Sequence, residues 1–230
     1  METPFSFAPK NDMTVEEAEE VFNKYFASKP RVKEFIEETQ KQACIDGYVE
    51  TLNGHRRLLQ DIFSKDRKTF NGALRKAVNT KIQGSGAYLT NFSLALIDDF
   101  IRINNMRAKI VVTVHDSIVI DIPKDEIPIL VPVCKKIMEN LPIDFLKIEW
   151  EGEIIQFPIE ADFEVGLNYN DMVDLDLDEL ATFNSVKGYT DYHMALKNIK
   201  NYMDSGNITK EEYDACIAEI ERQLPSYQSI

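Results

Sequence analysis

The sequence predicts a mixed α+β fold in which helices flank a short β-hairpin. Apolar residues recur at helical spacing from Val15 onward, and helical periodicity returns near the C-terminus. Between these segments, two β-branched runs at residues 110–114 and 118–120 enclose a small polar triplet, a pattern typical of a tight hairpin. Helices at both ends and a hairpin between them indicate the α+β class.

The N-terminal helices carry signals for where they start and stop. Thr14 and Glu17 have the spacing of a capping box, in which each side chain satisfies a free backbone N–H group of the first turn. Pro30 is expected to break this helix, because proline has no N–H group to donate. A second helix is predicted over 32–45, with Gly47 just past its end.

Turn residues and periodicity predict the elements that follow. An Asn-Gly pair at 53–54 is a strong turn signal at the centre of a hairpin predicted over 48–59. A long helix is predicted over 73–105, interrupted or softened at 83–86, where the side chains become small. Three more elements are expected: a helix over 128–140, a strand over 154–165 and a last helix over 210–224.

The charge is distributed unevenly along the chain. The formal net charge is −13, which taken alone disfavours nucleic acid as a partner. Residues 1–92 carry 14 basic and 13 acidic residues, whereas residues 93–230 carry 12 basic and 26 acidic residues. Residues 54–81 hold eight basic residues and two acidic ones, and a local basic segment can bind phosphate because screening confines fields to about 8–10 Å. The acidic half indicates a metal, a need for solubility or a basic partner.

Several protein classes are disfavoured by residue usage. The three cysteines are far apart and odd in number, which predicts buried thiols rather than a disulfide framework: Cys44, Cys134 and Cys216. The three histidines are too scattered to indicate a zinc site. The sequence has neither an apolar run near the ~18 residues of a membrane span nor a signal-peptide layout, so we expect a cytoplasmic protein.

The central hairpin presents a carboxylate. Its geometry is expected to push Asp116 out at the tip of a stiff two-stranded support. A lone acid in such a place can hold a divalent cation opposite acids from elsewhere. An ordinary turn is the alternative interpretation, because Asp and Ser are common turn residues.

Three donor-bearing side chains share one row of the long helix. Arg75, Asn79 and Gln83 are spaced i, i+4 and i+8, which aligns them along one face. The row runs directly into the small residues 84–87, where another backbone could approach closely. A solvated helix face is the alternative, since polar side chains are usually exposed.

Four ordered stretches together resemble a known family. They read GYVETLNGHRRLLQDI, RKAVNTKIQGSGAYL, VTVHDSIVIDIP and VGLNYNDM. This set resembles the C-terminal part of family-A DNA polymerases, the bacterial polymerase I type. The resemblance covers residues 13–172, and the order and spacing of four motifs make it specific.

The resemblance implies roles for individual residues. Asp116 matches the palm acid that binds two Mg²⁺ ions, and His115 matches the histidine near the primer terminus. Three residues match side chains that face the primer–template minor groove and the nascent base pair: Arg75, Asn79 and Gln83. Arg56 and Arg57 fall where the family has basic residues. Every Watson–Crick pair presents acceptors at similar minor-groove positions, so donors there can test pair geometry without reading sequence.

The resemblance also implies a domain organisation. Four segments are expected: fingers-end helices at 1–45, the fingers-to-palm hairpin and long helix at 46–105, a palm with the His-Asp-Ser hairpin at 106–170, and an acidic helical appendage at 171–230. The appendage lies beyond the family's usual end. Its acidic run is either a solvated edge or a docking surface, and its last helix packs on this chain or on another protein.

The chain departs from the family pattern in two ways. The third hairpin residue is usually Glu, whereas here it is Ser117, so either that position is not essential or the hairpin holds metal more weakly. The family's other palm Asp, its nucleotide-binding fingers helix and its thumb are not found in this sequence. We therefore expect the C-terminal subunit of a split DNA polymerase, with primer–template DNA and dNTP as ligands, no membrane, and Mg²⁺ shared with an N-terminal subunit. Split replication genes suggest a bacteriophage, and hence the host cytoplasm.

Two other functions remain open. One is a non-catalytic DNA-binding or scaffold subunit of a replication complex, which Ser117 and the acidic balance favour. The other is a metal-dependent phosphohydrolase built on His115 and Asp116, which would need further His and Asp ligands.

Overall fold

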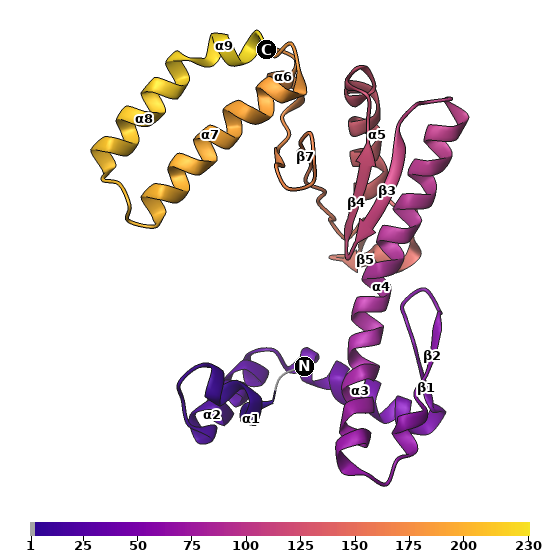
Figure 1. The fold of residues 1–230 in the computed structure, drawn as a ribbon. Helices are drawn as coiled ribbons and strands as arrows, with labels where there is room; N and C mark the ends of the chain where they lie inside the picture. Colours follow the sequence, from indigo (N-terminus) through magenta and orange to yellow (C-terminus); the bar gives the residue numbers. More distant parts are fainter. Residues whose placement is uncertain (1–2) are drawn as a thin grey trace. The chain divides into compact units, whose positions relative to one another are not determined.

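The structure is a computed structural model that describes residues 3–230. It is a mixed α+β protein, mostly helical with β-hairpins, as the sequence predicts (Figure 1). The chain forms two compact units. The first contains residues up to Phe92 together with His115–Ser117 and Ile143–Gln156, and the second contains Ser93–Val114, Ile118–Pro142 and Phe157–Ile230.

Pairs of short strands stand between groups of helices. From the N-terminus to the long helix they are α1 (Pro4–Phe7), the 3₁₀ turn η1 (Ala8–Lys10), α2 (Val15–Ser28), α3 (Pro30–Asp46), β1 (Tyr48–Glu50), β2 (Arg56–Leu58), η2 (Gln60–Phe63) and α4 (Arg67–Ile103). The middle of the chain contains β3 (Lys109–Val114), β4 (Ser117–Asp121), η3 (Lys124–Glu126), α5 (Ile127–Glu139), η4 (Asp144–Leu146), β5 (Lys147–Trp150) and β6 (Glu153–Gln156). The chain ends with β7 (Glu164–Val165), β8 (Val173–Asp174), α6 (Leu177–Leu180), α7 (Val186–Asp204), α8 (Lys210–Arg222) and α9 (Leu224–Gln228).

The helix boundaries follow the local signals of the sequence. Thr14 and Glu17 form the predicted capping box of α2. Pro30 occupies the first turn of α3, where a missing N–H group costs nothing because it would have no helical partner. Gly47 closes α3 with φ of 72°, a left-handed conformation that suits glycine.

The core of the first unit lies between α3, the β1–β2 hairpin and α4. Six buried side chains form it: Ala43, Val49, Leu59, Ile62, Ala73 and Ala77. The hairpin turns at Leu52 and Asn53, with Gly54 in a left-handed conformation just after them, and its register pairs Tyr48 with Leu58 and Glu50 with Arg56. The alanines on α4 leave room for the hairpin and η2 to approach the helix closely.

Small residues on α4 form a second contact with this hairpin. A Cβ atom built on Gly84 would lie 2.7 Å from Thr51 Cγ2, which is closer than carbon atoms pack. The neighbouring Ser85 is buried, and its Oγ accepts a hydrogen bond of 2.9 Å from the backbone N–H of Leu52. The predicted interruption of the helix at 83–86 is therefore wrong. The helix is continuous from Arg67 to Ile103, and its small residues serve tertiary packing instead.

In the second unit, α5 separates two apolar cores. Leu130 and Cys134 face the end of α4 and the β3–β4 sheet, where they pack with Ile97 and Ile101 (Figure 1). Burial raises the pKa of the Cys134 thiol to about 11. Cys134 is buried as expected, whereas Cys216 is half-buried and Cys44 is exposed, so the expectation of three buried thiols is wrong for Cys44.

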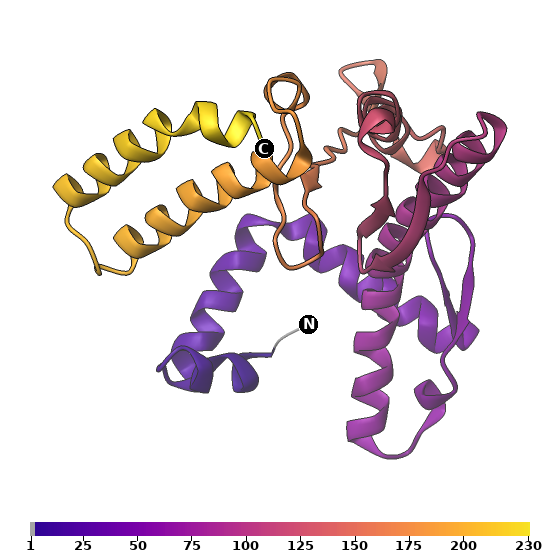
Figure 2. The same cartoon turned by 45° about the horizontal axis from the view of Figure 1, so that its top comes forward.

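The start of α5 shares an apolar cluster with the C-terminal segment. Ile127 and Val131 pack there with Phe183 and Tyr189. The α7 and α8 helices form an antiparallel pair followed by α9 (Figure 2). The apolar stripe predicted on the last helix packs on the same chain, since Ile220 of α8 contacts this core.

Polar contacts also fasten this C-terminal segment. The Tyr189 hydroxyl donates to the Asp174 carbonyl at 2.9 Å and accepts from the Asp176 N–H at 3.0 Å. Burial raises the pKa of Tyr189, so the hydroxyl stays protonated and can donate. Lys124 Nζ donates to the backbone carbonyl of Phe183 at 3.0 Å. Hydrogen bonds from the side chains of Tyr189 and Lys124 thus fix the backbone of this segment.

A buried carboxylate ties the turn after α4 to the start of α5. Glu126 accepts hydrogen bonds from the N–H groups of Arg107 and Ala108, each at 2.9 Å, and pairs with the Arg107 guanidinium. These hydrogen bonds, chiefly the one from the Arg107 N–H group, hold the pKa of Glu126 below its usual value. The carboxylate therefore serves as a charged cap for a turn that lacks other partners for these N–H groups.

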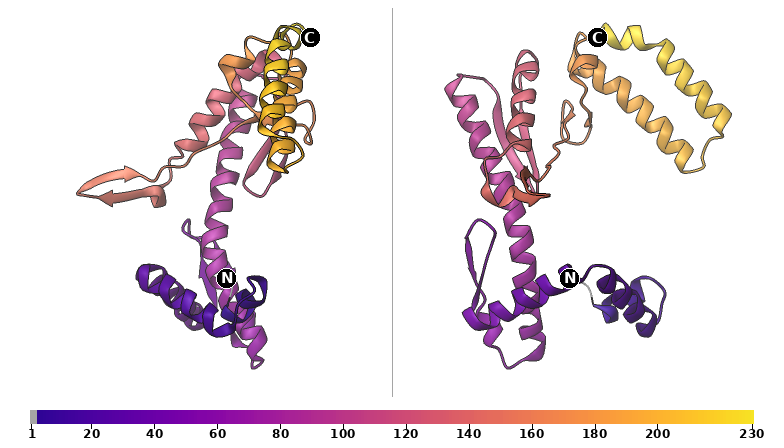
Figure 3. Two further views of the ribbon diagram at one scale, coloured as in Figure 1. Left: turned by 90° about the vertical axis from the view of Figure 1, so that its left-hand side faces the viewer. Right: turned by 180° about the vertical axis from the view of Figure 1, so that it is seen from behind.

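The strand predicted over 154–165 is wrong in both position and length. Residues 147–156 instead form the β5–β6 hairpin, and only Glu164 and Val165 of the remaining stretch form a strand, β7 (Figure 3, left). Glu151 and Gly152 turn the chain with φ of 52° and 85°, the backbone that a two-residue hairpin turn requires. Every sheet among residues 3–230 has two strands. In the same residues, no helix is both long and apolar enough to cross a membrane.

The contact at Gly84 predicts opposite outcomes for two neighbouring glycines. Gly84→Ala should lower the free energy of unfolding by about 1 kcal/mol, because overpacking against buried Thr51 costs about 1–3 kcal/mol while the helix gains at most about 1 kcal/mol. Gly86→Ala is the matched control, since no atom lies within 4 Å of its added Cβ, and it should gain roughly 0.5–1 kcal/mol. Urea unfolding followed by circular dichroism measures both. Equal stabilisation by the two alanines would show that the close approach is absent.

The Glu126 cap predicts a pH-dependent stability. Because the folded-state pKa is lowered, its contribution is present above the usual carboxyl pKa and is lost as the pH falls through the lowered value. Glu126→Gln should lower the melting temperature by several degrees near pH 7, and the gap to the native chain should close as the pH falls through the lowered pKa of Glu126. Asp144→Asn serves as control, because Asp144 is paired with Lys147 on the surface, where such pairs contribute little. A gap that stays constant with pH would contradict the assignment.

Candidate nucleic-acid and metal site

The tip of the β3–β4 hairpin carries the predicted carboxylate. A two-residue turn, His115 and Asp116, connects the strands, and both side chains are exposed. His115 has φ of 56°, a left-handed conformation that is uncommon for residues other than glycine and carries backbone strain. Residues 115–117 belong to the first compact unit, together with α4 up to Phe92 and the β1–β2 hairpin.

Asp116 fits one part of a magnesium site. Its carboxylate oxygens are the ligand type that Mg²⁺ prefers, and its exposure leaves them accessible. Within residues 3–230, no three His, Cys, Asp or Glu side chains lie close enough together to hold a metal ion. The described part of the chain therefore offers a ligand but not a complete set of ligands.

The predicted donor row lies on α4 in the same unit. Arg75 and Asn79 are half-buried and Gln83 is exposed, so the row passes from the packed part of the helix to the surface. The buried alanines 73 and 77 occupy a different side of the helix, where they pack in the core. A ligand can therefore reach the row along one side of α4, while the other side of the helix packs in the core of the first unit.

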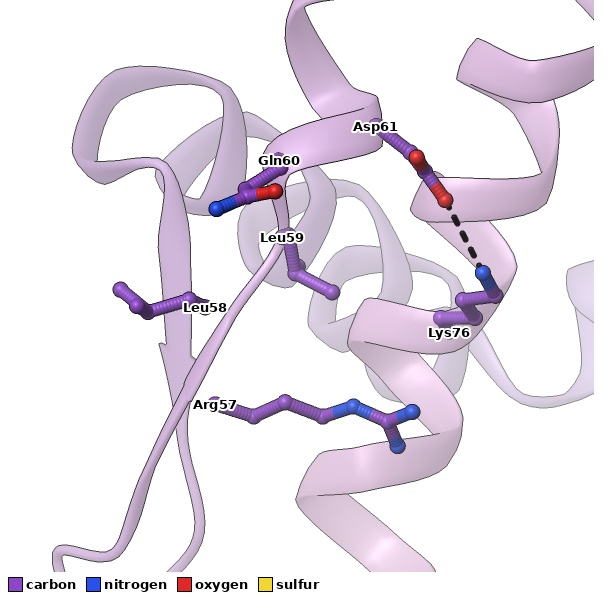
Figure 4. Close-up of a pocket in the computed structure, with 6 residues that line it drawn as sticks. All are labelled: Arg57, Leu58, Leu59, Gln60, Asp61 and Lys76. Carbon is purple, nitrogen blue, oxygen red and sulfur yellow. Dashed lines mark hydrogen bonds and ion pairs between the residues drawn. The ribbon is translucent and has the colours of Figure 1, made fainter.

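Arg57 stands beside this helix at the edge of a pocket of about 350 Å³. Figure 4 shows its side chain extending from β2 toward α4, where its Nη1 donates to Thr80 Oγ1 at 3.1 Å. On the opposite side of the pocket, Lys76 Nζ pairs with Asp61 at 3.0 Å. Arg57 has no acidic partner among residues 3–230, so its charge is uncompensated.

Arg56 is in a different situation. Its guanidinium pairs with Glu50 across the hairpin and lies over the Tyr48 ring, 4.8 Å from the centroid. The hydrogen bond to Glu50 raises the pKa of Arg56 above its ordinary value. The two adjacent arginines therefore differ, because the charge of Arg56 is partly neutralised within the hairpin.

Two features near the site were not predicted from the sequence. Lys76 and Thr80 line or support the pocket, and both lie within the basic segment 54–81 that the sequence indicates, although neither was singled out. The β5–β6 hairpin was missed as well. A Glu-Gly pair between alternating polar and apolar residues was its signal.

Comparison with known proteins identifies the family. Residues 2–171 match the sequence profile of DNA polymerase family A. A DNA polymerase of Bacillus phage SP01 is 39% identical over 168 residues, which cover 73% of this chain and 18% of the phage protein. DNA polymerase I of Geobacillus stearothermophilus is 30% identical over 167 residues, again 73% of this chain and 18% of that protein.

A solved structure agrees with these sequence matches. The POL domain of Pol1 from M. smegmatis, in a complex with DNA primer–template and dNTP, superposes with a TM-score of 0.58 at 28% identity. The match covers 60% of this chain and 24% of that one. This chain belongs to DNA polymerase family A. It spans less than a fifth of the length of the two curated relatives described above, 18% in each case.

The contrast between the two arginines predicts different effects on DNA binding. Arg57→Ala should weaken binding of a primer–template duplex and reduce the slope of log K against log salt by about 0.9, the value for one lost phosphate contact. Arg56→Ala should have a smaller effect, because Glu50 already neutralises part of its charge. Arg102→Ala is the control, since Arg102 is paired with Asp98 in the second unit. Fluorescence anisotropy at several salt concentrations measures all three, and equal losses for Arg56 and Arg57 would contradict the distinction.

Proposed function

We propose that this chain is the C-terminal subunit of a split DNA-directed DNA polymerase of family A. In this proposal it supplies one catalytic metal-binding Asp and the contacts to the primer–template minor groove. A separate polypeptide supplies the thumb, the other palm Asp and the fingers helix that binds the incoming nucleotide. The supporting observation is the exposed Asp116 at a hairpin tip that belongs to the same compact unit as the donor row of α4.

Each residue of the site has a role in this proposal. Asp116 would hold Mg²⁺, which family-A polymerases use and which, when bound, activates the primer hydroxyl and stabilises the leaving pyrophosphate. His115 lies next to it at the tip, near the primer terminus. The donors of α4 contact minor-groove acceptors that every Watson–Crick pair shares: Arg75, Asn79 and Gln83. Arg57, and to a lesser degree Arg56, bind backbone phosphates of the duplex.

The partner subunit is proposed because one carboxylate is too few for two metal ions, and the described residues contain no cluster that could complete the site. The similarity to the phage SP01 polymerase supports a bacteriophage origin, and hence function in the host cytoplasm.

The same proposal assigns the chain's segments. Residues 1–45 correspond to the end of the fingers, 46–105 to the hairpin and long helix, 106–170 to the palm and 171–230 to the appendage. Residues 1 and 2 lie outside the described structure. The family match ends at residue 171, in keeping with an appendage that the family does not share.

A non-catalytic DNA-binding subunit is the second candidate. Ser117 stands where the family usually has Glu, which removes one carboxylate from the hairpin. In that case the chain would bind DNA through the same arginines, but Asp116 would be dispensable for synthesis.

The decisive variant is Asp116→Asn in a reconstituted enzyme. The purified chain alone should not extend a primer, and adding the phage SP01 polymerase lacking its matching 168-residue stretch should restore Mg²⁺-dependent synthesis. Asp116→Asn should then reduce the rate about a thousandfold, since loss of a metal-bound carboxylate removes roughly 4 kcal/mol of transition-state stabilisation, while leaving complex formation intact.

Two results would refute the proposal. Primer extension by the isolated chain would show that no partner is needed. An unchanged rate in the Asp116→Asn enzyme would favour the non-catalytic candidate. Asp121→Asn provides the matched control, because it removes a carboxylate from the same hairpin away from the tip.

A further inference from the structure

The β5–β6 hairpin presents an apolar face that nothing in its own unit covers. Its register pairs Ile148 with Ile155 and Trp150 with Glu153. Side chains alternate between the two faces of a strand, so Ile148, Trp150 and Ile155 lie on the same face, with Glu153 opposite Trp150. Trp150 is 63% exposed, and the two isoleucines retain 38% and 39% of their exposure. We call these three side chains the hairpin face.

The base of the hairpin is firmly attached to the first unit. Ile143 and Leu146 are buried just before β5. The Phe145 ring lies 6.3 Å from the Tyr88 ring of α4, and Tyr88 in turn stacks on Phe92 at 5.7 Å. The hairpin is therefore attached at its base to α4, the helix that carries the donor row. Its two strands extend away from this attachment.

The strands themselves have little to stabilise them. All eight residues of β5 and β6 are exposed (Figure 3, left). Within residues 3–230, no third strand pairs with these two. A two-stranded hairpin is marginal in water unless one face packs on another structure. Large exposed apolar and aromatic side chains are typical of the centre of protein interfaces. The hairpin face thus has the properties of a docking surface.

The charges around the hairpin face restrict what can bind there. Glu153 lies on the hairpin face opposite Trp150, Glu151 lies in the turn beside it and Glu149 lies on the other face, while Lys147 is already paired with Asp144. Glu151 and Glu153 therefore repel the phosphates of DNA at this face. They also disfavour a symmetric contact with a second copy of this chain, which would bring the same acids face to face. The occupant that fits is a protein with an apolar groove bordered by Lys or Arg.

We propose that the hairpin face docks on the separate polypeptide that completes the polymerase. This inference rests on the proposed function, under which the two polypeptides must assemble without a covalent link. A DNA-binding partner is expected to be rich in Lys and Arg, which complements Glu151 and Glu153. The surface is small compared with a stable interface of about 800 Å² per partner, so it is one contact of a larger assembly.

Trp150 is a direct probe of this contact, because it is the chain's only tryptophan. Labelling the full chain with fluorotryptophan gives a single fluorine NMR signal. That signal should shift when the truncated phage SP01 polymerase is added, and it should stay unchanged with primer–template DNA alone or with increasing concentration of this chain. Titration calorimetry measures the affinity of the same mixture.

Variants on the two faces of the hairpin separate docking from folding. Ile148→Asp and Ile155→Asp should each weaken binding of the truncated phage polymerase at least about tenfold, because they place a charge in an apolar contact. Ile154→Asp is the matched control. Ile154 lies on the opposite face and is 77% exposed, so its affinity should stay within about twofold of the native chain.

The outcomes distinguish this inference from the function on which it rests. If the mixture extends primers but Ile148→Asp binds normally, the docking surface is wrong and the polymerase proposal stands. If the native mixture extends no primers, the polymerase proposal fails, and the docking inference fails with it. A fluorine shift on adding DNA alone identifies a nucleic-acid surface instead, and a shift on concentrating the chain alone identifies self-association. Either shift overturns the proposal.

Discussion

The close approach of Thr51 to Gly84 is the contact on which the geometry of the first unit depends. It holds the β1–β2 hairpin against α4 at one position along the helix, and the hydrogen bond from Leu52 to Ser85 prevents sliding. With that register set, Arg57 reaches Thr80, one turn before the glycine. The basic side chains of the hairpin and the donors of α4 therefore form one rigid surface rather than two independent ones.

Local interactions explain which elements the sequence could predict. The capping box at Thr14 and the left-handed Gly47 depend on neighbours within four residues, so their signals are complete in the sequence. The continuity of α4 through Gly84 is different, because its small residues pack against a hairpin that lies more than 30 positions away in the chain. The misplaced strand at 154–165 has a simpler cause. Alternating residues on both sides of Glu151-Gly152 form a hairpin, which a search for one long strand overlooks.

The candidate site divides in the same way. The residues at the hairpin tip and in the helical row could be identified from spacing and motif alone, since turn and helix geometry place them. The contrast between Arg56 and Arg57 could not, because it depends on Glu50 across the hairpin and on Thr80 of α4. Adjacent residues of the same type differ here only through tertiary partners, and no periodicity carries that information.

The C-terminal segment shows that a family boundary and a folding boundary are separate things. The match to the family ends at residue 171, yet Phe183 and Tyr189 bury one side of α5, which belongs to the matched part. Cutting the chain at the homology limit would leave Ile127 and Val131 facing water and free the Lys124 ammonium from its backbone carbonyls. Residues 172–230 therefore fold together with a helix of the family-matched part and do not form a separable addition.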